Sequence, residues 1–367
     1  MKRRSLRPCG AEADRLGRGR AYVSVRRPRP TKSFAPRARP LPRRAVHSTG
    51  ATSIAVSTTT PFRIASRLGL TTAGTMFCLI VVGSIVRTTG SGLACPDWPL
   101  CHGRLIPPFQ FNVMIEWFHR LLALVVSLLL AATVGWTFAH RATRARLGGL
   151  SIVMVMLLAA QVVLGALTVW KLLDPSVVGG HLAVALLLFS SVLAFTLIAD
   201  RETATARPVA TRPPGLLPWL AGATFVTYVQ CVLGGMVSTQ HAGLVCPDWP
   251  TCNGQWFPAL EGLVGVHMIH RFGAYTLTAI MLVTAIRLRS VDDEAVRFAG
   301  PPLLSLTVGQ VVLGVSNVVL GTPWWLSAGH LALASAILGL ILTVTFRVAT
   351  LPARERVPTP AALRTGS

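Results

Sequence analysis

The chain has 367 residues, of which 52% are hydrophobic and only 13% are charged. This balance is too apolar for an ordinary soluble domain and is typical of a polytopic membrane protein. The net charge of +22 does not indicate a nucleic-acid partner, because residues 1-67 hold 17 of the 35 Lys and Arg in a Pro-rich stretch that lacks aromatic interleaving.

The basic segment 1-67 is expected to be a disordered cytoplasmic tail. Its Arg-rich, Ser-bearing and acid-poor composition also fits an organelle transit peptide, so a mitochondrial location stays open. The tail lacks the apolar core of a secretory signal peptide before residue 68. The first apolar segment is therefore expected to remain in the mature protein.

Eight apolar runs each reach or approach the roughly 20 residues that span the hydrocarbon core. In lipid the backbone must satisfy its own hydrogen bonds, so these runs are predicted to be helices and the fold all-α. Four helices fall in residues 68-200 and four in 215-347, joined by a linker at 201-214 and followed by a tail at 348-367. The predicted spans are 68-88, 112-138, 148-170, 177-199, 215-238, 261-287, 301-320 and 325-347.

The two halves repeat one another at an offset of about 151 residues, which predicts two tandem pseudo-symmetric four-helix bundles. His119 and Arg120 are answered by His270 and Arg271, whereas Glu116 is answered by His267. A downstream echo matches residues 180-183, GHLA, with residues 329-332, which pairs His181 with His330. The loop motif CPDWPLC at 95-101 is answered by CPDWPTC at 246-252.

Arginines in alternate loops set the orientation of the helices. The segments 139-147, 200-214 and 287-300 each carry three arginines, and the intervening loops carry few basic residues. By the positive-inside rule these segments and both termini are predicted to be cytoplasmic, and the two cysteine loops exoplasmic. All four histidines then fall in the outer half of the membrane.

Two histidines per half, at one depth and on different helices, favour the two axial positions of a haem iron. A single such histidine could equally be a hydrogen-bonded core residue, but the repeated pairing argues against that for the set. Zinc is disfavoured, because a structural zinc site takes four ligands and a catalytic site takes three plus water, and neither half offers that many within its predicted spans.

Glu116 lies three residues before His119 and is expected to face the same cavity. Its carboxylate could accept a proton, remain a neutral acid, or stabilise positive charge that develops on a substrate. A salt bridge to Arg120 is disfavoured on the argument that the two side chains diverge around the helix. Arg120 and Arg271 are instead predicted to meet haem propionates or to extend toward lipid headgroups.

The cysteines Cys95 and Cys101, and likewise Cys246 and Cys252, are predicted to pair in local disulfides on the oxidising side of the membrane. A structural staple and a redox-active pair both remain open. Glycines recur at matching places in the repeats and are interpreted as close-packing positions between helices. They are Gly83, Gly165, Gly234 and Gly314.

The segment VRTTGSGLACPDWPLCHG at 86-103, followed by Glu116-x-x-His119-Arg120, closely resembles the haem A synthase family. The resemblance covers about residues 68 to 347. It implies an eight-helix membrane enzyme that oxidises the C8 methyl group of haem O to the formyl group of haem A, by successive hydroxylations, for cytochrome oxidase.

The resemblance further implies that His270 and His330 hold a haem b cofactor, while His119 and His181 receive haem O with Glu116 beside the reacting methyl group. It implies a haem O synthase and a ferredoxin-like or quinol electron donor as partners, and it allows a homo-oligomer. Cysteine pairs in both loops resemble bacterial members, which favours a bacterial plasma membrane over the mitochondrial inner membrane.

A bis-histidine b-type cytochrome that carries electrons from quinol is the main alternative, and a thiol-oxidising membrane protein is a weaker one. The acid that occurs in one half only favours the enzyme, because an electron carrier has no evident use for it. The thiol-oxidising alternative leaves the histidines inside the membrane unexplained.

Overall fold

The computed structural model describes residues 59–204 and 210–354, and all of its long elements are helices. The greater part of the predicted basic tail and the last residues of the chain lie outside these ranges. Within them, eight helices are long and apolar enough to cross a membrane, so the predicted all-α polytopic fold is confirmed. The spanning helices are α1 (Thr59–Thr88), α2 (Phe111–Ala139), α3 (Arg141–Trp170), α4 (Pro175–Arg201), α5 (Leu216–Thr239), α6 (Gly262–Leu288), α8 (Gly300–Val319) and α9 (Trp324–Ala349).

Two helices begin seven or more residues earlier than the apolar pattern predicted. α1 begins at Thr59 rather than residue 68, with Pro61 in its first turn, where a missing N–H costs nothing. α3 begins at Arg141, so the arginines assigned to the loop 139-147 lie in its first turns instead. The reason is that Arg is a good helix former, and a helix continues past the hydrocarbon edge where apolar residues stop.

Two short helices lie in segments predicted to be loops. α7 (Glu294–Arg297) is capped by Asp293, whose carboxylate accepts a hydrogen bond from the Val296 amide. The 3₁₀ turn η1 (Ala242–Leu244) follows α5 and contacts both α5 and α6. Such short elements have no apolar periodicity and are set by capping and tertiary contact.

The helices pack in two sets of four with the same internal pairings. In the first set α1 contacts α2 and α4, while α3 contacts α2 and α4; in the second α5 contacts α6 and α9, while α8 contacts α6 and α9. α4 contacts α5, and α9 contacts both α1 and α4, so these four helices lie where the two sets meet. Exact repeat symmetry stays a prediction.

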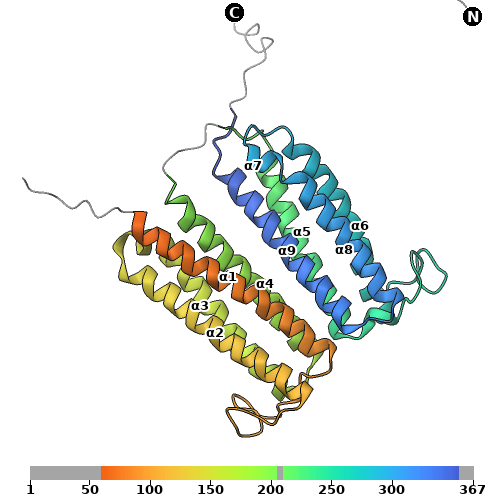
Figure 1. Cartoon of the computed structure of the whole chain (residues 1–367). Helices are drawn as coiled ribbons and strands as arrows, with labels where there is room; N and C mark the ends of the chain where they lie inside the picture. The colour runs from red at the N-terminus through yellow and green to blue at the C-terminus, as the bar shows by residue number, and fades with distance from the viewer. Residues whose placement is uncertain (1–58, 205–209, 355–367) are drawn as a thin grey trace, which may run out of the picture. The chain divides into compact units, whose positions relative to one another are not determined.

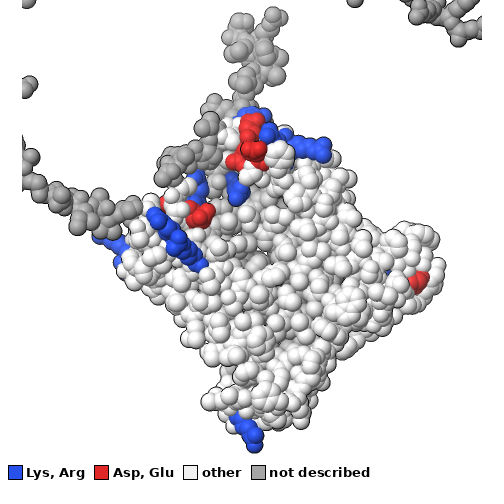
Figure 2. Space-filling view, in the orientation of Figure 1, with Lys and Arg blue, Asp and Glu red and all other residues white. Residues whose placement is uncertain are grey.

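Figure 1 shows both cysteine loops at one end of the helices and α7 at the opposite end. In Figure 2, charged side chains gather toward the ends and leave the middle of this face uncharged. Large apolar side chains along the helices are exposed, among them Leu128, Met156 and Val312. An apolar, uncharged belt of this kind is what lipid-facing helices require.

Candidate functional site

The four predicted histidines line one cavity of about 1370 Å³. His119 and His270 lie eight residues after the first residue of α2 and α6, and His181 and His330 lie six residues after the first residue of α4 and α9. At 1.5 Å per residue, all four are about 9–12 Å from the start of their helices, on the side of the cysteine loops. The structure therefore brings together all four at one level.

Each histidine ring rests against a glycine of a neighbouring helix. A Cβ atom at Gly83, Gly234 or Gly314 would lie 3.1, 2.9 or 3.0 Å from Cε1 of the ring it faces, in His119, His270 and His330 respectively, and one at Gly165 would lie 3.5 Å from His181. The glycines are therefore close-packing positions between helices, as predicted, and the group that packs against each is an imidazole ring. They leave room for imidazole rings, which sequence spacing alone could not show.

The imidazoles have few hydrogen bonds to the protein. Nδ1 of His119, His181 and His330 is buried without a hydrogen-bond partner among the described residues. Nδ1 of His270 lies 2.9 Å from the side-chain amide nitrogen, Nε2, of Gln230, a contact that the sequence did not suggest. Imidazoles without protein partners are suited to bind a group in the cavity.

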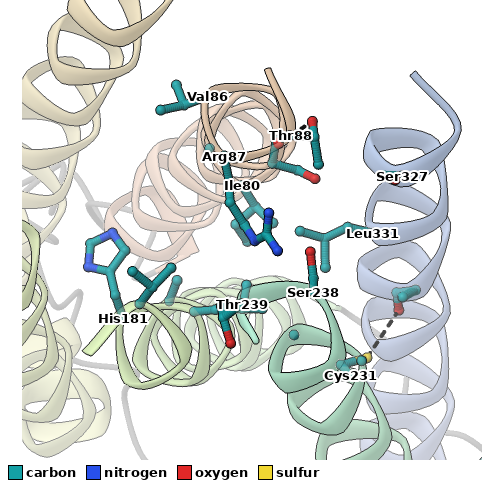
Figure 3. Close-up of a pocket in the computed structure, with 18 of the residues that line it drawn as sticks. Ile80, Val86, Arg87, Thr88, His181, Cys231, Ser238, Thr239, Ser327 and Leu331 are labelled. Atoms are coloured by element: carbon teal, nitrogen blue, oxygen red, sulfur yellow. Dashed lines mark hydrogen bonds between the residues drawn. The ribbon is translucent and has the colours of Figure 1, made fainter. Parts of the chain in front are cut away.

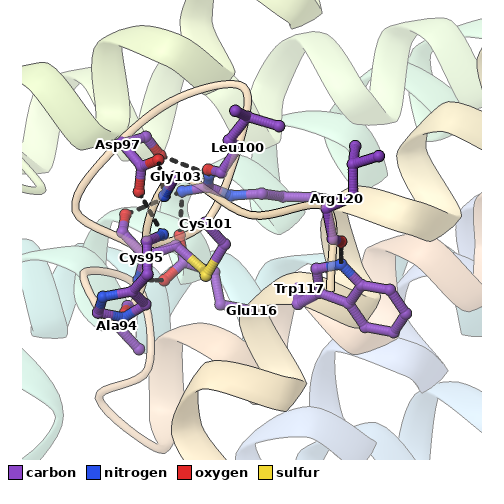
Figure 4. The surroundings of a disulfide bond; sticks show 11 residues. Ala94, Cys95, Asp97, Leu100, Cys101, Gly103, Glu116, Trp117 and Arg120 are labelled. Carbon is purple, nitrogen blue, oxygen red and sulfur yellow. Dashed lines mark hydrogen bonds and ion pairs between the residues drawn. A yellow bond between two sulfur atoms is a disulfide. The ribbon is translucent and has the colours of Figure 1, made fainter. Parts of the chain in front are cut away.

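The first cysteine loop is folded around Asp97 and Arg120 (Figure 4). Asp97 accepts hydrogen bonds from the Gly103 and His102 amides at 2.8 and 2.6 Å. These amides, Gly103 foremost, hold the pKa of the Asp97 carboxyl below its usual range, and the positive charge of Arg120 adds to this. The disulfide Cys95–Cys101 closes the loop.

The guanidinium of Arg120 binds three backbone carbonyls of the first cysteine loop. Its Nη1 donates to the carbonyls of Asp97 and Leu100, each at 2.6 Å, and its Nη2 donates to that of Cys95 at 3.0 Å. Arg120 therefore positions the loop, and its terminal nitrogens already have partners. The predicted contact with a haem propionate stays a prediction without support from this geometry.

The second loop repeats the arrangement. Asp248 accepts from the Thr251 hydroxyl and from two backbone amides, which lowers the pKa of its carboxyl. Arg271 donates to the carbonyls of Asp248, Thr251 and Cys246 at 3.0, 2.8 and 2.7 Å. A disulfide joins Cys246 and Cys252. Arg271 thus positions the second loop, as Arg120 positions the first.

Glu116 is nearly buried, at 4% exposed, and lines the cavity. Its Oε1 accepts from Arg120 at 2.6 Å, and its Oε2 accepts from the Cys95 amide at 2.8 Å. The expectation that Glu116 and Arg120 diverge was wrong, because residues four apart lie on the same helical face. The structure therefore places a paired carboxylate beside the first cysteine loop.

His267 occupies the position of Glu116 in the second half but makes different contacts. Its Nδ1 lies 2.7 Å from the Ala242 carbonyl, and its Nε2 accepts from Nε of Arg271 at 3.0 Å. A neutral imidazole satisfies both contacts, so this half holds no carboxylate at that position. The two halves share a scaffold and differ in charge beside the cavity.

The residues present fit haem. The cavity exceeds the volume of about 300–1,000 Å³ that is usual for one small ligand. Its lining is largely apolar, with two imidazoles from different helices of each half. Neutral imidazole nitrogens in an apolar four-helix setting are suited to axial ligation of iron.

Comparison with known proteins identifies the family. Residues 66–342 match the COX15-CtaA family, described as cytochrome oxidase assembly protein. A haem A synthase of Symbiobacterium thermophilum is 30% identical over 259 residues, which cover 67% of this chain and 83% of the relative. The chain belongs to the haem A synthase family.

Other relatives carry the same name. A haem A synthase of Shewanella oneidensis is 28% identical over 312 residues, covering 73% of this chain and 92% of the relative. One of Shouchella clausii is 29% identical over 262 residues, covering 69% and 86%. Membership of the haem A synthase family implies haem binding, in agreement with the imidazoles in the cavity.

Proposed function

We propose that the chain is the enzyme that oxidises the C8 methyl group of haem O to a formyl group by successive hydroxylations, yielding haem A. One observation carries this proposal: among the described residues, a single cavity is lined by two pairs of imidazoles and by one carboxylate, that of Glu116, beside the first pair. A pure electron carrier needs the imidazoles but not the carboxylate.

The two pairs have different roles in this proposal. His270 and His330, in the half 215-347, hold a resident haem b; His119 and His181, in the half 68-200, receive haem O. The haem b supplies electron transfer when bound. A contact in the second half supports this division. The Gln230 side chain donates through Nε2 to the His270 carbonyl at 2.8 Å and packs against the ring, whereas Nδ1 of His119 has no partner among the described residues.

Glu116 is the group that distinguishes the substrate half. Removal of electrons from a methyl carbon builds positive charge beside the macrocycle, and a carboxylate fixed in a low-dielectric cavity stabilises such charge more than water does. Arg120 and the Cys95 amide hold this carboxylate in one position. It is therefore preorganised as an electrostatic stabiliser, and during turnover it is also a candidate proton acceptor.

The test is Glu116→Gln in the full chain, expressed in a host that makes haem O. Because Gln keeps the side-chain shape and an acceptor for the Cys95 amide, we expect haem O or a hydroxylated intermediate to accumulate while the low-spin haem b spectrum stays. His267→Gln is the matched control at the equivalent position and should leave haem A production largely intact. Near-normal haem A from Glu116→Gln would remove Glu116 from the mechanism.

The cofactor assignment has its own test. Replacement of His270 or His330 by Ala should remove the low-spin signal of the purified protein. Replacement of His119 or His181 by Ala should impair the binding and oxidation of haem O and leave that low-spin signal unchanged. An unchanged bis-histidine spectrum in both His270→Ala and His330→Ala would refute the assignment of haem b to this half.

The proposed location is a bacterial plasma membrane, with both termini in the cytoplasm and both cysteine loops outside. The bacterial relatives and the basic residues at the end opposite these loops support it. A haem O synthase supplies the substrate, and a ferredoxin-like or quinol donor supplies electrons. The cysteine pairs act as structural staples of loops that Arg120 and Arg271 bind.

A further inference from the structure

Arg87 is a cationic residue that the catalytic scheme above does not use. It lies in the last turn of α1 and lines the cavity. Figure 3 shows its side chain extending from α1 into the space that α4, α5 and α9 also border. Its side chain has no hydrogen bond or ion pair within the described residues, and its buried Nε has no partner. A half-buried guanidinium without a counter-ion is costly inside a membrane and marks a functional position.

The other arginines of the cavity wall are differently placed. Arg120 and Arg271 use their terminal nitrogens on loop carbonyls. The remaining one, Arg104, is exposed in the first cysteine loop. Of the cavity-lining residues that the structure describes, Arg87 is therefore the guanidinium that is both enclosed and free to bind an anion.

The position of Arg87 relative to the first imidazole pair follows from α1. Gly83, four residues earlier and on the same helical face, is the residue against which His119 rests. Arg87 thus lies about one turn, roughly 6 Å along the helix, farther toward the cysteine loops than the level of that imidazole. A macrocycle bound at His119 with its polar edge toward the membrane surface would present carboxylates at this height.

The second half lacks this cation. At the same offset of 151 residues, Gly234 lies against His270, and the residue one turn beyond is Ser238. The exchange of Arg87 for Ser238 parallels the exchange of Glu116 for His267. Both charged groups are therefore supplied by helices of the half proposed to receive the substrate, and the Arg87 side chain lies at the boundary with α5 and α9 of the second half (Figure 3).

We propose that Arg87 binds a propionate carboxylate of haem O in the first half; this rests on the proposed function. Arginine presents a planar fork that matches a carboxylate in two parallel hydrogen bonds. The C8 methyl group and one propionate are substituents of the same pyrrole ring. Haem O has two propionates on adjacent rings, each next to a methyl group. A fixed propionate therefore restricts the methyl group beside Glu116 to one of these two, which makes Arg87 a specificity-determining residue.

The test compares binding of two ligands by the purified full chain with its cofactor, without reductant or oxygen so that no turnover occurs. The ligands are haem O and its dimethyl ester, which lacks the carboxylate charges, and the variants are Arg87→Gln, Arg87→Lys and the control Arg104→Gln. The wild type should bind the free acid about 10- to 100-fold more tightly than the ester, the range for a charge-assisted hydrogen-bonded pair.

Arg87→Gln should abolish this preference, Arg87→Lys should retain part of it, and Arg104→Gln should retain all of it. A second readout is the position of oxidation in the products of Arg87→Gln, where methyl groups other than C8 should appear. An unchanged preference for the acid in Arg87→Gln would overturn the proposal. Loss of haem b with the preference unchanged would also overturn it and assign Arg87 to the cofactor. Failure of the wild type to bind haem O would instead refute the proposed function itself.

Discussion

Substitution of Gly234 by Ala tests the packing of an imidazole against a glycine most directly. The added Cβ would lie 2.9 Å from Cε1 of His270, about half an ångström short of ordinary van der Waals contact at 3.4 Å. The ring has little freedom to retreat, because Gln230 contacts its Nδ1. A shift of about 0.5 Å is the tolerance within which a ligating residue must be held.

Overpacking of a well-packed site costs about 1–3 kcal/mol, which corresponds to about a 5- to 150-fold loss of haem affinity if the imidazole bears the strain. Apart from this contact, Gly→Ala within a helix stabilises by about 0.5–1 kcal/mol. The expected outcome is a protein with a stable helical fold that retains less haem b. Haem content per protein, reduced-minus-oxidised spectra and haem titration of the stripped protein measure it.

Gly329→Ala is the matched control, because Gly329 precedes His330 in α9 and a Cβ there meets nothing within 4 Å. It should retain normal haem content and a normal spectrum. If Gly234→Ala retains haem b with the affinity and spectrum of Gly329→Ala, the inference that Gly234 makes room for His270 is refuted. Equal damage by both substitutions would show that the loss is not specific to the ring contact.

Three further predictions concern the cysteine loops. Asp97→Asn should speed amide exchange at His102 and Gly103 at neutral pH. In the wild type the pKa of the Asp97 carboxyl is lowered. Its contribution to the protection of these amides is therefore present above the ordinary value near 3.9 and is lost as pH falls through the lowered one. Equal protection of these amides in the wild type and Asp97→Asn at neutral pH would contradict this. Mass spectrometry of non-reduced peptides should find both cysteine pairs joined within their own loops, and full alkylation without reduction would exclude that. Reporter fusions at residues 105 and 255 should score as exoplasmic, and a cytoplasmic score at either would overturn the orientation.

The apolar segments could be predicted well because the bilayer imposes length and composition on each helix separately. A helix lies at every predicted apolar segment, and the largest differences are the starts of α1 and α3. Both errors arise where a helix leaves the hydrocarbon region, since the apolar signal ends there but backbone hydrogen bonding does not. α7 was missed because one turn has no periodicity to detect.

The site was predicted unevenly. The histidines could be found because ionisable residues stand out in an apolar run and the repeat pairs them. The partners of Arg120 could not be predicted, because the loop carbonyls that it binds carry no sequence signature. Arg87 was visible as a mismatch with Ser238, but only the cavity shows that its side chain has no partner.

The sequence by itself determined the class of this protein and its eight helices, and it singled out the histidines proposed as haem ligands, because these depend on local composition and on a repeat that can be read directly. Only the tertiary structure decided what each glycine and arginine contacts. The reason is physical: whether Gly83 faces a helix or a ring, and whether a guanidinium is satisfied or free, depends on atoms from other helices that approach within 3 to 4 Å. The spacing of residues within one segment does not show which atoms of other helices lie that close.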